Sequence, residues 1–119
     1  MSQHKQTLMQ TAAGRRFIAF LTIFNSGNAD RLRTYIAENT TEKALESQSV
    51  DDRWQQLIDT MNEVGKLRVH QVVAADDHYI VVLVQAKNTG DFYINEYKVD
   101  EEYPHKVMKY THHLADESR

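Results

Sequence analysis

The sequence predicts an α+β fold in which three N-terminal helices pack on a curved, four-stranded antiparallel sheet. Two observations lead to this prediction. Residues 67–114 fall into four runs rich in Val, Ile, Leu, Tyr and Phe, which suit a pleated and half-buried surface. Residues 7–64 instead place their apolar side chains three and four positions apart, as amphipathic helices do. Helices that cover one face of an antiparallel sheet define the α+β class.

The helical spacing predicts helices at about 7–25, 28–38 and 49–64. Gly27 suits the left-handed position that ends the first helix, and Ser49 is a suitable N-cap for the third. Residues 42–49 are ambiguous and are expected to form at most a short helical turn. The expected core consists of Phe17, Phe20, Leu21, Phe24, Leu32, Trp54, Leu57, Ile58, Val82 and Val84.

The four strands are expected at 67–75, 78–87, 92–99 and 106–114, with turn-forming residues between them. Connections this short join antiparallel neighbours, because a parallel pair needs a long crossover. We therefore expect each strand to pair with the next strand along the chain.

Pairing the residues that flank each turn predicts a register, with Ala75 opposite His78, Asn88 opposite Asp91 and Val99 opposite Lys106. Side chains alternate between the two faces of a sheet, and the more apolar face is expected to meet the helices. That inner face is predicted to carry Leu67, Val69, Gln71, Val73, Ile80, Val82, Val84, Ala86, Tyr93, Asn95, Tyr97, Met108, Tyr110, His112 and Leu114.

Composition narrows the classes of function. The net charge of -3, with both signs mixed, argues against a nucleic-acid surface, and the absence of Cys removes disulfides and thiolate metal sites. No apolar run approaches the roughly 20 residues of a membrane span, and the first residues do not resemble a secretory signal. A glycine-rich phosphate loop and the common catalytic motifs are also missing. We expect a soluble, cytoplasmic, single-domain protein over residues 1–119, with no cofactor and no metal ion.

Two stretches of the chain resemble the nuclear transport factor 2-like superfamily, also called cystatin-like. The first is residues 17–32, where an amphipathic helix ends in Phe24-Asn25 before a small turn, and the second is Pro104-His105-Lys106-Val107. The resemblance covers roughly residues 8–114. It implies a long N-terminal helix, a strongly bent sheet around a conical pocket, and dimers formed sheet to sheet. Superfamily enzymes often place an acid or a His-Asp pair in the pocket, and no residue here matches such a motif.

A pocket is expected between the inner face of the sheet and the helices, since a mostly apolar wall with a few convergent polar groups suits a small molecule. The alternative is a filled core in which each hydroxyl and amide pairs with the backbone. The residues expected to line the pocket are Gln71, Tyr93, Asn95, Tyr97, Tyr110 and His112 from the sheet, with Trp54 and Tyr35 from the helices.

His112 is the only candidate for a catalytic group. Its unperturbed pKa near ~6.5 would let an inward imidazole act as an acid or a base beside Tyr93 and Tyr110. The alternative is a hydrogen-bonded histidine in the core or at its rim. His113 is expected to point to the opposite face, so the two histidines are poorly placed to bind one metal ion.

A homodimer is expected through the outer face of the sheet. The run from Tyr79 to Val84 is apolar on both sides, whereas a strand with one face in water alternates. A contiguous exposed apolar patch usually marks an interface. The alternative is a monomer in which residues 114–119 cover the patch. The residues expected in this interface are Val72, Val81, Leu83, Ile94 and Val107.

Three hypotheses for function follow. The first is a non-enzymatic, dimeric domain whose conical pocket binds an apolar small molecule. The second is a cofactor-independent isomerase, dehydratase or cyclase that uses His112 and the inward tyrosines. The third is an accessory or interaction domain of the kind found beside bacterial hydrolases. The superfamily that the chain resembles includes isomerases, dehydratases, polyketide cyclases, transport adaptors, oligomerisation modules and accessory domains of larger enzymes, so the resemblance does not choose among these hypotheses.

Overall fold

The computed structural model describes residues 3–115 and places them in five helices followed by four strands. Each strand pairs antiparallel with the next along the chain, so the sheet order is β1-β2-β3-β4. The predicted α+β class with one antiparallel sheet is confirmed, whereas the expected number of three helices is wrong. The elements are α1 Gln3–Met9, α2 Ala12–Ser26, α3 Ala29–Asn39, α4 Glu42–Ser47, α5 Val50–Val64, β1 Leu67–Ala75, β2 Tyr79–Ala86, β3 Phe92–Val99 and β4 Val107–Leu114.

Local hydrogen bonds explain where the helices begin and end. The side-chain oxygen of Thr11 accepts a hydrogen bond from the backbone amide of Gly14 and thereby caps the start of α2. The single helix expected over 7–25 is therefore divided into α1 and α2. Ser49 caps α5 through the amide of Asp52, as its position predicted. Gly27 ends α2 in the left-handed conformation with φ of 74°, which a residue with a side chain rarely adopts.

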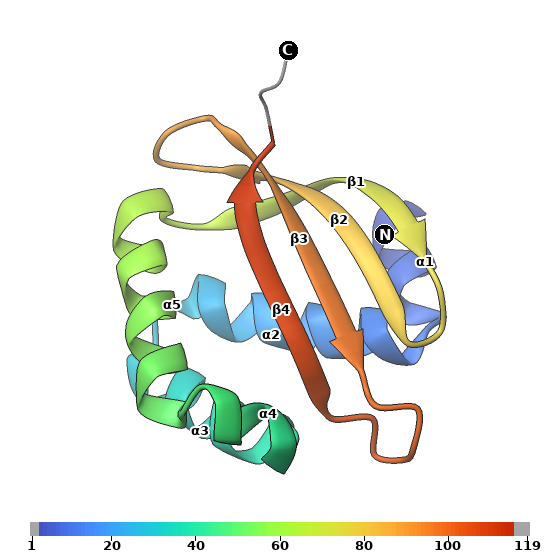
Figure 1. Cartoon of the computed structure of the whole chain (residues 1–119). Helices are drawn as coiled ribbons and strands as arrows, with labels where there is room; N and C mark the ends of the chain where they lie inside the picture. Colours follow the sequence, from blue (N-terminus) through green and yellow to red (C-terminus); the bar gives the residue numbers. More distant parts are fainter. Residues whose placement is uncertain (1–2, 116–119) are drawn as a thin grey trace.

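Figure 1 shows how the helices surround one face of the sheet. Helix α2 crosses behind the twisted sheet, and α1 lies at the end of the molecule where β1 turns into β2. The helices α3, α4 and α5 gather on the other side, next to the edge strand β4. Within residues 3–115, no helix combines the length and apolar character needed to cross a membrane.

The core lies between α2 and the inner face of β2 and β3. Phe17, Phe20 and Phe24 come from one stripe of α2 and are at most 2% exposed. Of the expected core residues, eight are buried, whereas Trp54 and Ile58 are only partly buried and pack against its edge. The indole nitrogen of Trp54 donates to the carbonyl of Ala29 at 2.9 Å, which joins α5 to the start of α3.

The predicted register of β1 is correct from Leu67 to Val69 and wrong beyond it, because β1 contains two irregularities, between Val69 and Gln71 and between Val72 and Ala74. Each adds one residue to β1 and reverses the faces of the residues that follow it. Gln71 therefore lies opposite the outward Leu83 and is exposed, so it does not line a pocket. Val72 lies opposite the buried Val82 and packs against the core, so it is not part of the outer face.

The other two registers differ from the prediction by two residues. Between β2 and β3 the cause is a longer loop, whereas between β3 and β4 the loop adds one residue of the shift and a bulge in β4 adds the other. Tyr97 pairs with Ile80 and with Tyr110, instead of with Val82 and Met108. A shift of two leaves every side chain on its predicted face. Tyr93, Asn95, Tyr97, Tyr110 and His112 consequently point inward as expected.

One exception arises at the start of β4. A bulge lies beside Lys98, so that Val99 pairs with Val107 and Met108 is the additional residue. Val107 is thereby turned inward and is 5% exposed, while Met108 is 42% exposed. The expectation that Val107 belongs to the outer face is wrong, as is the inward placement of Met108.

Candidate functional site

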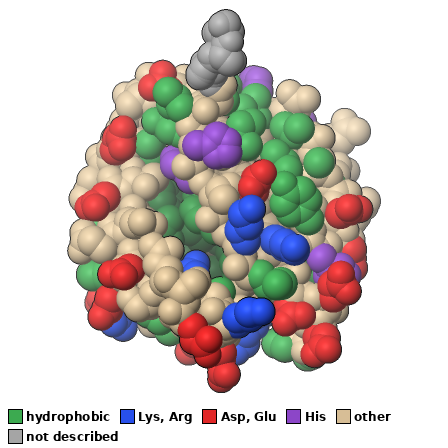
Figure 2. All heavy atoms as spheres, viewed as in Figure 1, with side chains coloured by type: hydrophobic (Ala, Val, Ile, Leu, Met, Phe, Trp, Pro, Cys, Tyr) green, Lys and Arg blue, Asp and Glu red, His purple; other side chains and the backbone are tan. Residues whose placement is uncertain are grey.

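A cavity of about 360 Å³ opens between the helices and the inner face of β3 and β4. Figure 2 shows it as a hollow with hydrophobic side chains in its depth and a basic side chain at its edge. The volume lies at the lower end of the range of ligand pockets, which is about 300 to 1,000 Å³. Its lining residues are Phe20, Tyr35, Ile36, Thr40, Gln48, Arg53, Gln56, Leu57, Asp59, Thr60, Tyr97, Val107, Tyr110 and His112.

Aromatic rings form the floor of the cavity. The ring of Phe20 lies 4.9 Å from that of Tyr110 and 5.7 Å from that of Tyr97, measured between centroids. The hydroxyl of Tyr35 donates to the carbonyl of Arg16 at 2.9 Å and lies 3.3 Å from the hydroxyl of Tyr97. Burial raises the pKa of both phenols, so each remains a neutral hydrogen-bonding group at neutral pH.

Tyr110 differs from these two tyrosines. Its hydroxyl oxygen is buried and has no hydrogen-bond partner among residues 3–115. Burial raises the pKa of this phenol as well, so the hydroxyl keeps its proton. Buried polar atoms are nearly always paired, so this hydroxyl is an exception among the described residues.

His112 is held in a defined orientation. Its Nδ1 lies 2.7 Å from Oδ1 of Asn95, and its ring stacks on Tyr93 with centroids 4.4 Å apart. Burial, and secondarily the neighbouring His113, lowers the pKa of His112 to about 4. The imidazole is therefore neutral at pH 7, and because a carboxamide oxygen only accepts, Nδ1 carries the proton and Nε2 is free to accept.

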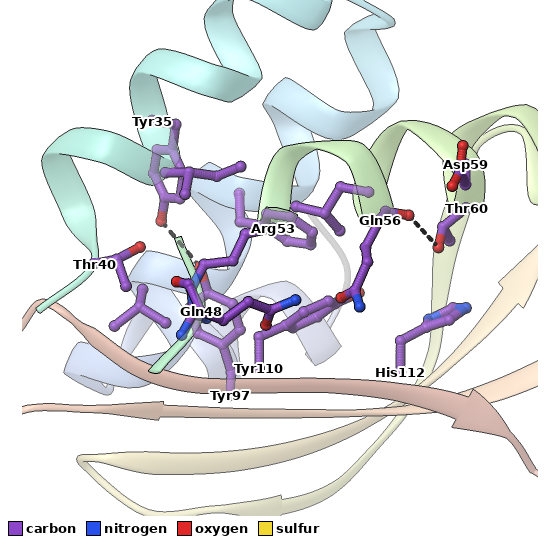
Figure 3. A pocket seen from close by; sticks show the side chains of 14 residues that line it. Tyr35, Thr40, Gln48, Arg53, Gln56, Asp59, Thr60, Tyr97, Tyr110 and His112 are labelled. Carbon is purple, nitrogen blue, oxygen red and sulfur yellow. Dashed lines mark hydrogen bonds between the residues drawn. The ribbon is translucent and has the colours of Figure 1, made fainter. Parts of the chain in front are cut away.

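The rim of the cavity carries the polar side chains of α5. Arg53 donates from Nε to the carbonyl of Gln48 at 2.8 Å and from Nη2 to that of Ala44 at 2.7 Å. Burial lowers the pKa of its guanidinium, and no carboxylate within residues 3–115 forms an ion pair with it. Figure 3 shows Arg53 and Gln56 reaching down toward the sheet, while the carboxylate of Asp59 points away from it.

The structure brings together half of the expected pocket. Tyr35, Tyr97, Tyr110 and His112 all line the cavity. The other expected residues do not: Gln71 is outward, Trp54 contacts α3, and Asn95 and Tyr93 lie behind His112.

The polar rim of α5 was missed by the sequence analysis. Arg53, Gln56 and Thr60 lie three and four residues apart, so they form one stripe along the helix. That stripe lies beside the apolar stripe that includes Leu57. The spacing of these three polar residues is the feature of the sequence from which a polar rim next to the core could have been predicted.

No group of three or more His, Asp or Glu side chains in the described part of the chain is placed to hold a metal ion. No family model, curated protein or solved structure matches the chain.

Proposed function

We propose that the protein is a non-enzymatic domain whose cavity binds a small, largely apolar molecule, within the conical, cystatin-like arrangement that the family resemblance implies. The observation that carries this proposal is the cavity of about 360 Å³ itself, with aromatic rings at its floor and polar side chains at its rim. A mostly apolar wall with a few fixed polar groups is the usual composition of a ligand pocket.

The protonation states of the cavity favour binding over catalysis. A general acid or base works best when its pKa lies near the operating pH. The pKa of His112, about 4, lies well below neutrality, and burial raises the pKa values of Tyr35, Tyr97 and Tyr110 away from it. These groups are therefore suited to hydrogen bonding with a ligand.

A cofactor-independent isomerase, dehydratase or cyclase is the second candidate. The observation that favours it is the contact between Asn95 and His112, which leaves Nε2 as an oriented proton acceptor. Such an enzyme requires ligand binding to raise the pKa of His112 toward neutrality. The third hypothesis, an accessory or interaction domain, has no observation in its favour among residues 3–115.

The binding proposal is tested by filling the cavity. In ¹⁵N-labelled protein, the neutral probe 2-naphthamide is expected to shift the amide signals of α5 and β4 residues around the cavity. Thr60→Trp should abolish these shifts, because Thr60 lines the cavity. Thr22→Trp is the matched control: it lies on an exposed helix face, and each threonine hydroxyl donates to the carbonyl four residues earlier. Shifts that survive Thr60→Trp would contradict the proposal.

We also propose that two copies pair through the outer face of the sheet. Three aliphatic side chains occupy its centre, namely Val81, Leu83 and Ile94, and all three are only half-buried by their own chain. Glu96 lies beside them and accepts hydrogen bonds from Tyr79 and Thr111. A small apolar centre with satisfied polar neighbours is the composition expected of an interface.

A further inference from the structure

We propose that the cavity selects neutral aromatic molecules that carry a hydrogen-bond donor, a hydroxyl or an N–H group, and that Nε2 of His112 accepts this hydrogen bond. This inference rests on the proposed binding function and adds the chemical class of the ligand. It is carried by an oriented, accessible acceptor in the wall of the cavity and by the aromatic ring next to it on the same strand.

The ring of His112 is oriented by two contacts with β3. Its Nδ1 donates to Oδ1 of Asn95, whose side chain is fully buried, and its face stacks on Tyr93 with 16° between the ring planes. Because Nδ1 and Nε2 point in different directions from the imidazole, Nε2 does not face Asn95. Figure 3 shows the ring rising from β4 toward α5, at the end of the cavity below Thr60.

The Nε2 atom of His112 is both unpaired and accessible. It forms no hydrogen bond with any residue in the range 3–115. The buried side-chain atoms without a partner in this range are Nδ2 of Asn95 and the hydroxyl oxygen of Tyr110, and Nε2 is not one of them. Solvent can therefore reach this nitrogen, and so can a ligand in the cavity that His112 lines.

The polar groups of α5 above His112 do not occupy this acceptor. The hydroxyl of Thr60 donates to the carbonyl of Gln56 at 3.0 Å. The carboxylate of Asp59 accepts from the side chain of Gln55 at 3.1 Å and points away from the sheet (Figure 3). The acceptor is thus left for a ligand, and a donor is the group that pairs with it.

The charges of the cavity favour a neutral donor. Burial lowers the pKa of His112 to about 4, so at pH 7 the neutral imidazole offers a lone pair at Nε2 and repels the oxygens of a carboxylate. An ammonium group also donates, but the guanidinium of Arg53 lines the same cavity and forms no ion pair within residues 3–115. A second cation there would be repelled and would lose its hydration. A neutral hydroxyl or N–H group meets neither penalty.

The neighbouring inward side chain of β4 supplies a surface for the aromatic body of the ligand. Tyr110 and His112 are two residues apart on one strand, so they lie on the same face with their Cα atoms roughly 6.5 Å apart. The ring of Tyr110 is only partly buried, although its hydroxyl is not accessible. A bicyclic aromatic molecule is long enough to lie over this ring and still present its polar atom to Nε2.

The test compares indole with benzofuran in titrations of ¹⁵N-labelled protein followed by NMR at pH 7.5. The two molecules have the same shape, but benzofuran has an oxygen in place of the N–H group and cannot donate. Wild-type protein is expected to bind indole about three- to tenfold more tightly, the effect of one net hydrogen bond. Equal affinities, or binding of 2-naphthamide alone, would overturn the inference and leave the binding function standing. The absence of shifts with all three probes would overturn both proposals.

The imidazole signals of wild-type protein give a second measurement, which stands even if a variant is destabilised. Long-range ¹H–¹⁵N spectra of the free protein should show Nδ1 protonated and Nε2 unprotonated. Indole should shift the signal of Nε2, and benzofuran should not. A proton on Nε2 in the free protein would overturn the inference.

His112→Phe keeps an aromatic ring beside Tyr93 but removes the acceptor, so it should lower the affinity for indole to that for benzofuran. His113→Phe is the matched control, because it makes the same substitution at the next position of β4, where the side chain is exposed. This control should keep the wild-type preference. A preference for indole that persists in His112→Phe would contradict the assignment of Nε2 as the acceptor.

Discussion

The environment of His112 shows how a single residue determines what the cavity can do. The ring is clamped between a stacking contact with Tyr93 and a hydrogen bond to Asn95, and it is partly buried. Those contacts provide an acceptor for the imidazole proton but no carboxylate to stabilise its charged form. Burial therefore dominates, and the pKa of His112 falls to about 4.

This lowered pKa predicts a pH dependence of stability. In the unfolded chain the pKa of a histidine is about 6.5, so between pH 6.5 and 4 the unfolded state binds more protons than the folded one. Stability is therefore lost as the pH falls through this window, by about 1 to 2 kcal/mol between pH 7 and pH 5. Urea denaturation at both pH values should show this loss.

His112→Gln is expected to remove most of this difference between pH 7 and pH 5, since glutamine does not titrate. His70→Gln, at an exposed position on β1, should keep the wild-type difference. An equally steep pH dependence in His112→Gln would show that the histidine is not the group responsible.

The face of the sheet to which a side chain points could be predicted from the sequence wherever the strand is regular, because side chains then simply alternate between the two faces. Tyr97, Tyr110 and His112 face inward because a register error of two residues preserves the face. Gln71 was misplaced because the bulge next to His70 leaves no clear signal in a run of β-forming residues. Arg53 was missed because its role depends on the end of α4, where the carbonyls it binds are brought close only by the fold.

At the scale of elements, the boundary between α1 and α2 is the main feature that helical spacing does not reveal. Apolar residues keep their spacing from Leu8 through Phe24, so one helix is the simplest prediction. The structure instead turns the chain at Thr11 and packs the end of α1 against α2. Gly14 allows this contact, because a Cβ built there would lie 1.9 Å from the carbonyl oxygen of Leu8.

Gly14→Ala therefore separates two opposing effects. Helix propensity alone predicts a gain of up to about 1 kcal/mol from alanine. Overpacking against the backbone of α1 predicts a loss of about 1 to 3 kcal/mol, because that carbonyl cannot move without displacing the helix end. We expect the loss to dominate in urea denaturation.

Gly90→Ala is a useful comparison, since a Cβ there meets nothing within 4 Å and only the left-handed φ of 78° opposes it. Its cost should be about 1 kcal/mol. A Gly14→Ala protein more stable than wild type would mean that α1 does not pack against this part of α2.

At the scale of the whole molecule, the helices cover only one face of the sheet. The class and strand order followed from composition and loop length, but the extent of the outer apolar patch did not, because two of its five expected members turned inward. Val81, Leu83 and Ile94 remain, with Lys98 and Lys109 beside them (Figure 2 shows basic side chains next to hydrophobic ones on the sheet).

In the alternative monomer, residues 114–119 cover this patch. Leu114 pairs with the inward Tyr93, and residues 116–119 lie outside the described residues.

The proposed dimer predicts that Leu83→Glu shifts the protein toward monomer. Leu83 lies directly opposite Ile94 at the centre of the outer face, and burying a carboxylate between two identical patches would leave two like charges close together. The inner core should remain intact, because Leu83 faces away from α2 and its neighbours Val82 and Val84 are fully buried. Sedimentation equilibrium should therefore show a dimer for wild type and a monomer for Leu83→Glu, with unchanged far-UV circular dichroism.

Gln85→Glu is the control, because it adds the same charge to the same strand and the same face of the sheet, but at the polar edge beside Arg68. This variant should remain dimeric. A wild-type protein that sediments as a monomer at high micromolar concentration would refute the dimer.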